Sequence, residues 1–232
     1  MRRETVADQG LSILRSRILD GDLRPGDAVT EEAMARDIGV SRPTMREVLT
    51  ILVGEGLLTR HPSTRILQVT TLTSAEVTEI YAARRILESA GVDGARQATA
   101  EERGRLEDTI REMEAAVADN DLYALVQADS RCHAETVALT RSRHLCALHD
   151  QLMAKLNLTL SQVESDQPSD NAELLRLHRE YVELMLGGDT EAAKTQLLLR
   201  LDAAEKDVLE GLRRQETAGK TQRRTLPSAR AL

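Results

Sequence analysis

The stretch TEEAMARDIGVSRPTMREVLTILVGEG, residues 30–56, contains two helix starts in close succession. Thr30 can cap the N-terminus of a helix over EEAMARDI, whose first turn is acidic, and Gly39 can end that helix. Ser41 can cap a second helix that begins RPTMREVL, because Pro43 is tolerated in the first turn of a helix. Two helices joined by a short turn that contains glycine predict a helix-turn-helix.

The second of these helices has an apolar face and a polar face. Four apolar residues at helical spacing predict the buried face: Met45, Val48, Leu49 and Leu52. Arg42, Thr44 and Arg46 lie off this stripe near the N-terminal end, where a recognition helix enters the major groove of DNA. Taken alone, the same pattern is also typical of a solvated basic helix face.

The flanking segments complete a winged helix. A first helix is expected over 4–19, and the glycines and proline of DGDLRPGD separate it from the next one. Short strands are expected at LLTR and ILQV, around a turn that places Arg60, His61 and Arg65 on the wing. Residues 1–72 are therefore predicted to form a winged helix-turn-helix DNA-binding domain.

Charge is distributed unevenly along the 232 residues, whose net charge is −7. Residues 1–70 are neutral overall, residues 71–213 carry −11, and residues 214–232 carry +4. An acidic middle repels nucleic acid, so contacts with DNA are expected from the N-terminal part. The basic tail over 214–232 lacks apolar periodicity, and we expect it to be disordered.

Composition also bounds the location and the fold class. No apolar run approaches the roughly 20 residues of a membrane-spanning helix, and the N-terminus has no signal-peptide core. We therefore expect a cytoplasmic protein with no membrane partner, in which Cys132 and Cys146 are reduced. The chain has no Phe or Trp and three Tyr, so aliphatic side chains must build its core. This composition favours helices over a β-sandwich.

The C-terminal part predicts an all-α six-helix bundle over residues 73–213. Turn signals such as DN, SDQPSD and GGD separate segments with helical periodicity. The expected helices are 74–98, 101–118, 121–139, 143–164, 170–187 and 189–213. Short connections between helices are typical of a bundle. The predicted fold class is thus mainly α, with an N-terminal winged helix-turn-helix followed by the bundle.

Several charged or polar residues interrupt the apolar stripes of these helices. Asp129 and His133 are four residues apart in ADSRCHAE, on the side that also carries Val126 and Val137. The other inward polar residues are Arg84, His178 and Arg200. A buried charge without a partner is unfavourable. These five groups therefore either satisfy one another in the core or line a cavity that binds a ligand, and their number favours the cavity.

The N-terminal residues resemble the DNA-binding domain of the GntR family of bacterial transcription regulators. The family pattern is a G-x-L-x-P-G turn, an acidic opening of the second helix, then G-V-S-R-x-x-x-R-E-x-L and E-G-L. Residues 18–59 contain nearly every element of it. The resemblance implies DNA contacts by Ser41, Arg42, Thr44, Arg46 and, on the wing, Arg65.

The wing tip departs from the family pattern. The family usually has Arg-Gly there, whereas Arg65 is followed by Ile66 in this chain. A β-branched residue takes a positive φ with difficulty, so a different turn is expected at the wing.

The C-terminal part resembles FCD, a helical ligand-binding domain of this family, in its six-helix form. The FCD pattern has an Arg four residues before a Glu, then D-x-x-x-H, then a His before Gly-Asp, and a final His. The matching residues are Arg84 with Glu88, Asp129 with His133, and His178. In the family, the Asp and the three His hold a divalent metal that helps to bind a small carboxylate. Arg200 stands here at the position of the last His.

Arg200 changes the chemistry that the resemblance implies. Asp129, His133 and His178 still offer three ligands for a divalent ion such as zinc or nickel. However, a guanidinium beside them repels a cation and can itself bind a carboxylate bidentately. We expect an effector pocket without a metal, and a metal-holding pocket is the alternative. The expected effector-binding residues are Arg84, Asp129, His133, His178 and Arg200. His144 and His149, on the neighbouring helix, are expected to be surface or structural residues.

The function predicted from these features is that of a ligand-responsive DNA-binding transcription regulator, with repression as the expected mode. Two winged helices reading a palindromic operator in double-stranded DNA require a homodimer. A small carboxylate effector in the helical domain would modulate operator binding. One alternative is a structural DNA-binding protein with a filled, unresponsive core. A metal-dependent hydrolase is a weaker alternative, because the sequence lacks HExxH and a nucleophile constellation.

Overall fold

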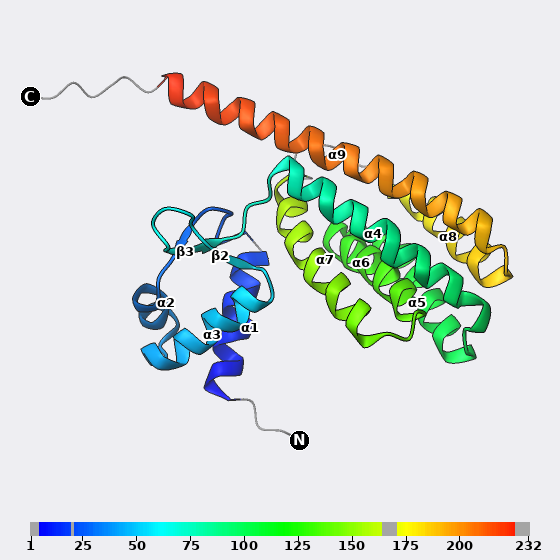
Figure 1. Cartoon of the computed structure of the whole chain (residues 1–232), viewed down its shortest axis with the longest axis horizontal. Helices are drawn as coiled ribbons and strands as arrows, with labels where there is room; N and C mark the ends of the chain where they lie inside the picture. Colours follow the sequence, from blue (N-terminus) through cyan, green and yellow to red (C-terminus); the bar gives the residue numbers. More distant parts are fainter. Residues whose placement is uncertain (1–4, 20, 164–170, 226–232) are drawn as a thin grey trace, which may run out of the picture.

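The computed structural model describes residues 5–19, 21–163 and 171–225 and is mainly helical, as the sequence predicts (Figure 1). The N-terminal elements are α1 (Val6–Leu19), β1 (Ala28–Val29), α2 (Glu31–Ile38), α3 (Arg42–Gly54), β2 (Leu58–Arg60) and β3 (Leu67–Val69). The C-terminal elements are α4 (Ser74–Gly94), the short 3-10 helix η1 (Ala95–Gln97), α5 (Ala100–Ala118), α6 (Leu122–Ala138), α7 (Arg143–Val163), α8 (Asn171–Gly187) and α9 (Thr190–Thr225).

The helix-turn-helix has the caps that the sequence predicts. The Thr30 side chain accepts a hydrogen bond from the Ala33 amide, and the Ser41 side chain accepts one from the Thr44 amide. Gly39 ends α2 in the left-handed conformation, with a φ of 80°. The predicted stripe of α3 is buried, and it packs with α1 into a core of its own. The exposed N-terminal end of α3 is therefore held in a fixed direction.

The wing is a small antiparallel sheet in the order β1-β3-β2. The sequence predicts the hairpin of β2 and β3 but not the two-residue strand β1, which is too short to show periodicity. In the turn, Arg65 takes the left-handed conformation with a φ of 60°. Ile66 does not, so the wing turn closes without a positive φ at the residue that follows Arg65.

Close contact between α4 and α6 fixes the interior of the bundle. A Cβ atom on Gly91 would lie 2.1 Å from the Thr136 carbonyl oxygen, and one on Gly94 would lie 2.3 Å from that of Leu139. Both positions therefore require glycine, and the two helices approach backbone to backbone. Thr73 caps α4 in a reciprocal capping box with Glu76, so α4 begins at Ser74, the first residue of the range expected from the sequence.

The last helix is longer than the sequence predicts. Apolar periodicity ends near residue 213, but α9 continues to Thr225, past the other helices of the bundle (Figure 1). Residues 214–225 contain no proline, and their Arg, Gln, Glu, Ala and Lys residues favour helix. The expectation of disorder from residue 214 is corrected to this extent, and residues 226–232 lie outside the described residues.

Helix α7 connects the two halves of the molecule. Its Leu156 is buried in the core of the bundle, whereas Leu158 is buried in the core of the winged helix. The side chain of Lys155 also lies against Gly56, at the end of the recognition-helix segment. Within the described residues, no helix combines the length and the apolar character needed to cross a membrane.

Candidate functional site

A buried ion pair on α4 begins the site. Arg84 and Glu88 are one helical turn apart, and Arg84 Nε donates to Glu88 Oε1 at 2.7 Å. Both side chains are buried, and the Arg84 guanidinium lies 5.1 Å from the centre of the Tyr81 ring. Arg84 therefore points into the bundle, as the sequence predicts. Glu88 supplies the counter-charge that a buried guanidinium requires.

Glu88 also contacts the histidine of α6. His133 Nδ1 lies 2.6 Å from Glu88 Oε2, and both side chains are buried. Burial alone would raise the pKa of Glu88, but the charges of Arg84 and then His133 outweigh it and hold the pKa well below the ordinary value. Burial lowers the pKa of His133 below its ordinary value, and the charge of Glu88 opposes this effect only in part.

A second group of charges lies beside the first and is formed by side chains of α6, α8 and α9. Arg200 Nη2 donates to Asp129 Oδ1 at 2.5 Å, and His178 Nε2 lies 2.9 Å from the same oxygen. Burial would raise the pKa of Asp129, but the charge of Arg200, followed by that of His178, holds the pKa well below its usual range. We refer to Arg84, Glu88, Asp129, His133, His178 and Arg200 as the polar cluster.

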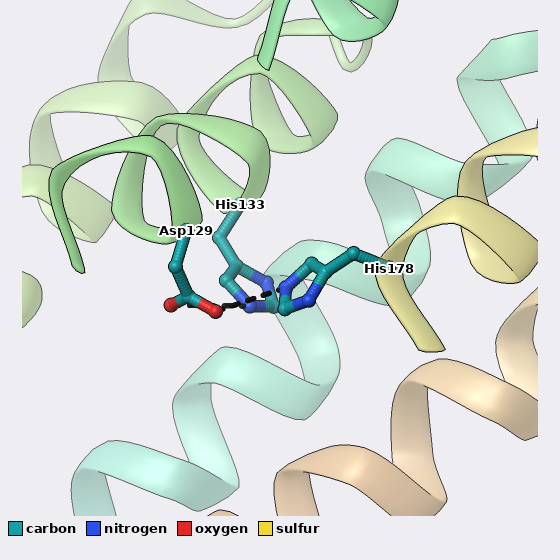
Figure 2. A group of neighbouring side chains, drawn as sticks. All are labelled: Asp129, His133 and His178. Carbon is teal, nitrogen blue, oxygen red and sulfur yellow. Dashed lines mark ion pairs between the residues drawn. The ribbon is translucent and has the colours of Figure 1, made fainter. Parts of the chain in front are cut away.

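The two histidine rings of the polar cluster lie edge to face, at an angle of 74°, and each has a partner on Nδ1. His133 Nδ1 is held by Glu88, and His178 Nδ1 contacts the Leu174 carbonyl oxygen at 2.9 Å. Each ring therefore directs Nε2 toward Asp129, as Figure 2 shows. One ligating atom from each of Asp129, His133 and His178 lies within 4.8 Å of the others. Histidines that bind a metal ion usually have such a partner on the other ring nitrogen, which orients the ligating nitrogen.

The position of Arg200 nevertheless disagrees with a resident metal ion. Its guanidinium already bonds to Asp129 Oδ1, the oxygen that also lies nearest to His178 Nε2. A divalent ion held by these three residues would share that oxygen with a permanently charged group at hydrogen-bond distance. Asp129, His133 and His178 therefore fit a metal ion less well than an Asp with three His would. The guanidinium of Arg200 supplies the positive charge beside Asp129 instead.

His149 is a member of this neighbourhood that sequence reasoning missed. It is buried on α7, and its Nε2 lies 3.5 Å from Glu88 Oε1. His149, Met153 and Leu156 recur at i, i+4 and i+7 and are all buried, so helical periodicity could have identified the position. Both histidines are expected from the sequence to be surface or structural residues: His144 is exposed, and His149 is buried in the interior.

The predicted DNA-contacting residues of α3 lie together on its exposed N-terminal end. Arg46 donates two hydrogen bonds of 2.9 Å to Glu31, and Arg42 donates one of 3.0 Å to Glu32. The Arg42 and Arg46 side chains remain 62% and 67% exposed, so α2 orients both guanidinium groups without covering them. Ser41 and Thr44 bond to each other through their hydroxyls at 2.7 Å.

The wing places its basic residues separately from those of α3. Arg65 is exposed at the turn, and its carbonyl oxygen accepts a hydrogen bond of 3.3 Å from Arg60 Nη1. His61 Nδ1 faces the Ser63 and Thr64 amides at 3.3 and 3.2 Å, which closes the turn. Two exposed basic surfaces, one on a helix and one on a wing, suit a major groove and its flanking phosphates.

Comparison with known proteins finds two family matches that together span most of the chain. The model described as "Bacterial regulatory proteins, gntR family" matches residues 7–67, and the one described as "FCD domain" matches residues 79–203. The polar cluster lies within the second match, and the exposed end of α3 lies within the first.

Individual relatives are similar over most of their length. The uncharacterized HTH-type transcriptional regulator YdhC of Bacillus subtilis is 28% identical over 188 residues, which cover 80% of this chain and 83% of that protein. The probable D-xylose utilization operon transcriptional repressor of Paenarthrobacter nicotinovorans is 29% identical, with 85% and 86% covered. A crystal structure of a GntR protein from Rhodococcus sp. RHA1 superposes with a TM-score of 0.76 at 26% identity, with 88% and 97% covered.

Proposed function

The chain belongs to the GntR family of bacterial regulatory proteins and carries an FCD domain, so it is a DNA-binding transcription regulator, and we propose that it is a homodimeric repressor controlled by a small carboxylate. The observation that carries this proposal is the inward Arg200, whose guanidinium lies in the polar cluster at the place expected for a metal charge. The cluster binds the effector and performs no catalysis.

Arg200 retains binding capacity beyond its contact with Asp129. Its Nε is buried and has no hydrogen-bond partner among the described residues. A guanidinium can donate from Nε and an Nη to the two oxygens of one carboxylate, which gives a bidentate pair. An effector carboxylate would therefore accept a hydrogen bond from Arg200 Nε, which the protein leaves without a partner. The new bond compensates for the water that the carboxylate loses on binding.

The remaining polar atoms suit a hydroxyl next to that carboxylate. Asp129 Oδ2 lies 4.0 Å from His133 Nε2, so neither atom is fully satisfied by the other. A hydroxyl can donate to the carboxylate and accept from a ring N–H. Hydroxy acids and sugar acids are accordingly the first class to test.

Control of DNA binding follows from two-fold symmetry. Two copies of α3, one from each protomer, read the two halves of a palindromic operator in double-stranded DNA. An effector changes operator affinity if it binds the DNA-competent and DNA-incompetent arrangements of the dimer unequally. The protein acts in the cytoplasm, where this DNA is accessible.

The proposal is tested by a thermal-shift panel of hydroxy acids, sugar acids and dicarboxylates, each measured with and without EDTA. A ligand at 100 times its dissociation constant adds about 2.7 kcal/mol to the free energy of unfolding, which is easily seen. We expect at least one acid to raise the melting temperature equally in both conditions, while its methyl ester does not. A rise that EDTA abolishes would show that a metal is bound despite Arg200.

Replacement of Arg46 by alanine is expected to weaken operator binding about ten- to hundredfold, because a base or phosphate contact is lost. The measurement is a fluorescence-anisotropy titration of the operator at fixed salt. Arg176→Ala is the matched control, because it removes the same charge from the exposed face of α8, far from α3. Glu31→Gln separates direct contact from positioning: equal losses in Glu31→Gln and Arg46→Ala would mean that Arg46 acts only through its ion pair.

A further inference from the structure

A cavity of about 820 Å³ lies between the winged helix and the bundle. One wall is formed by α1 and the segment after α3, through residues such as Leu19 and Leu57. The other wall is formed by α6 and α7, through residues such as Val126 and Met153. None of Arg84, Asp129, His133, His178 and Arg200 lines it, so this cavity is distinct from the proposed effector site.

The walls of the cavity are mainly apolar and carry little net charge. Arg15 is bonded to Glu55 by two hydrogen bonds of 3.1 and 2.5 Å, so these two charges offset each other. Arg131 is paired with Glu112, and the remaining charged wall residue, Asp150, is exposed to solvent. Such walls favour an uncharged molecule over an anion, in contrast to the polar cluster.

Two polar side chains of α7 meet the cavity with unused hydrogen-bonding atoms. His149 is 1% exposed, and its Nδ1 has no partner among the described residues. Asn157 also lines the cavity, about two turns further along α7. Its Oδ1 is likewise buried and has no hydrogen-bond partner among the described residues. A buried polar atom without a partner is destabilising, and a bound molecule that supplies the missing hydrogen bond removes that penalty.

We propose that this interdomain cavity is a second small-molecule site, which takes an uncharged and mainly apolar ligand that carries a hydroxyl group. The volume falls within the range of small-molecule pockets, and apolar walls with a few directed polar atoms are their usual composition. The hydroxyl donates to Asn157 Oδ1 or bonds to His149 Nδ1. The site requires neither the effector nor a metal, so it stands apart from the function proposed above.

Occupancy of the cavity also bears on DNA binding. The ligand contacts both the winged helix and α7. It therefore stabilises the relative position of the two domains that brings the two walls of the cavity together. His149 extends this contact to the polar cluster, because its Nε2 lies 3.5 Å from Glu88 Oε1. A ligand in the cavity is thus expected to change the affinity of the full chain for its operator.

Fluorescence of N-phenyl-1-naphthylamine, an uncharged apolar probe, tests the site in the full-length protein. We expect a saturable rise in emission on binding, and displacement by 2-naphthol at concentrations about three- to tenfold lower than by 2-methoxynaphthalene, which lacks the donor. Asn157→Leu should remove that preference. A probe signal that does not saturate, or equal displacement by the two naphthalenes, would overturn the proposal.

Substitutions that fill or charge the cavity locate the probe. Ala134→Trp places a large side chain in the cavity, and Leu122→Glu places a charge on a wall residue that is 43% exposed and so tolerates it. Each should weaken probe binding about tenfold or more. Leu199→Glu on α9 is the control, because Leu199 is 61% exposed and does not line the cavity. Wild-type affinity in both cavity variants, with melting temperatures unchanged, would place the probe elsewhere and refute the site.

The effect on DNA is measured in the same proteins. Saturating 2-naphthol should change the operator dissociation constant of the wild type at least about threefold, and Ala134→Trp should abolish the change. An unchanged dissociation constant with the cavity occupied would refute the coupling to DNA binding.

Discussion

Glu88→Gln is expected to lower the free energy of unfolding by about 3–5 kcal/mol. Glu88 is fully buried and is the carboxylate that Arg84, His133 and His149 all face. Glutamine preserves the shape but removes the negative charge, so the buried Arg84 guanidinium is left without a counter-charge. Because Arg84 cannot lose its proton near pH 7, the structure has to bear this penalty.

Urea denaturation followed by circular dichroism measures the change, with the slope compared to that of the wild type. Glu173→Gln provides the control, because that carboxylate pairs with Arg176 on the surface of α8, where solvent screens the interaction and a small effect is expected. The double variant Arg84→Met with Glu88→Leu should recover most of the loss, since it removes both charges together. If Glu88→Gln alone had only a small effect, the Arg84 guanidinium would have to be hydrogen-bonded by another residue or by water.

Local sequence signals predict the elements on which both sites depend. The caps at Thr30, Ser41 and Gly39 are properties of a few adjacent residues, and each is found where the spacing places it. The same holds for the inward Arg84 and His133, since a polar residue on an apolar stripe is visible from helical periodicity alone. Which groups then pair is a property of helix packing, and the sequence left open whether Asp129 would face Arg200 or a metal.

The features that the sequence did not predict depend on how separate segments of the chain pack against one another. His149 is directed at Glu88 only because α7 packs against α4, and no motif marks that approach. The positive φ of Arg65 follows from closure of the wing turn, in which a non-glycine residue takes the left-handed conformation. The cavity between the domains depends on how the winged helix sits against α6 and α7, which periodicity within one helix cannot encode.

Arg200→Ala is expected to abolish effector binding, with a loss of at least about a hundredfold in affinity, because a bidentate charge-assisted pair and its buried donor are both removed. Operator binding without effector should be preserved, since Arg200 lies in the helical domain, away from α3. Isothermal titration with the acid identified in the thermal-shift panel measures the first quantity, and operator anisotropy measures the second. Arg85→Ala is the matched control. Like Arg200, Arg85 forms ion pairs between helices, here from α4 to Asp202 and Glu205 of α9, but it lies outside the polar cluster.

Arg200→His separates the two roles that a positive charge could have at this position. The substitution removes the guanidinium from Asp129 and supplies an imidazole, so that an Asp and three His surround one point, a ligand set that suits zinc or nickel. We expect this variant, unlike the wild type, to bind about one zinc ion per chain and to regain a response to the acid that EDTA then abolishes. Stoichiometric, EDTA-sensitive zinc in the wild type would contradict the view that Arg200 takes the place of the metal. Acid binding by Arg200→Ala that equals that of Arg85→Ala would show that the carboxylate does not bind to Arg200 at all.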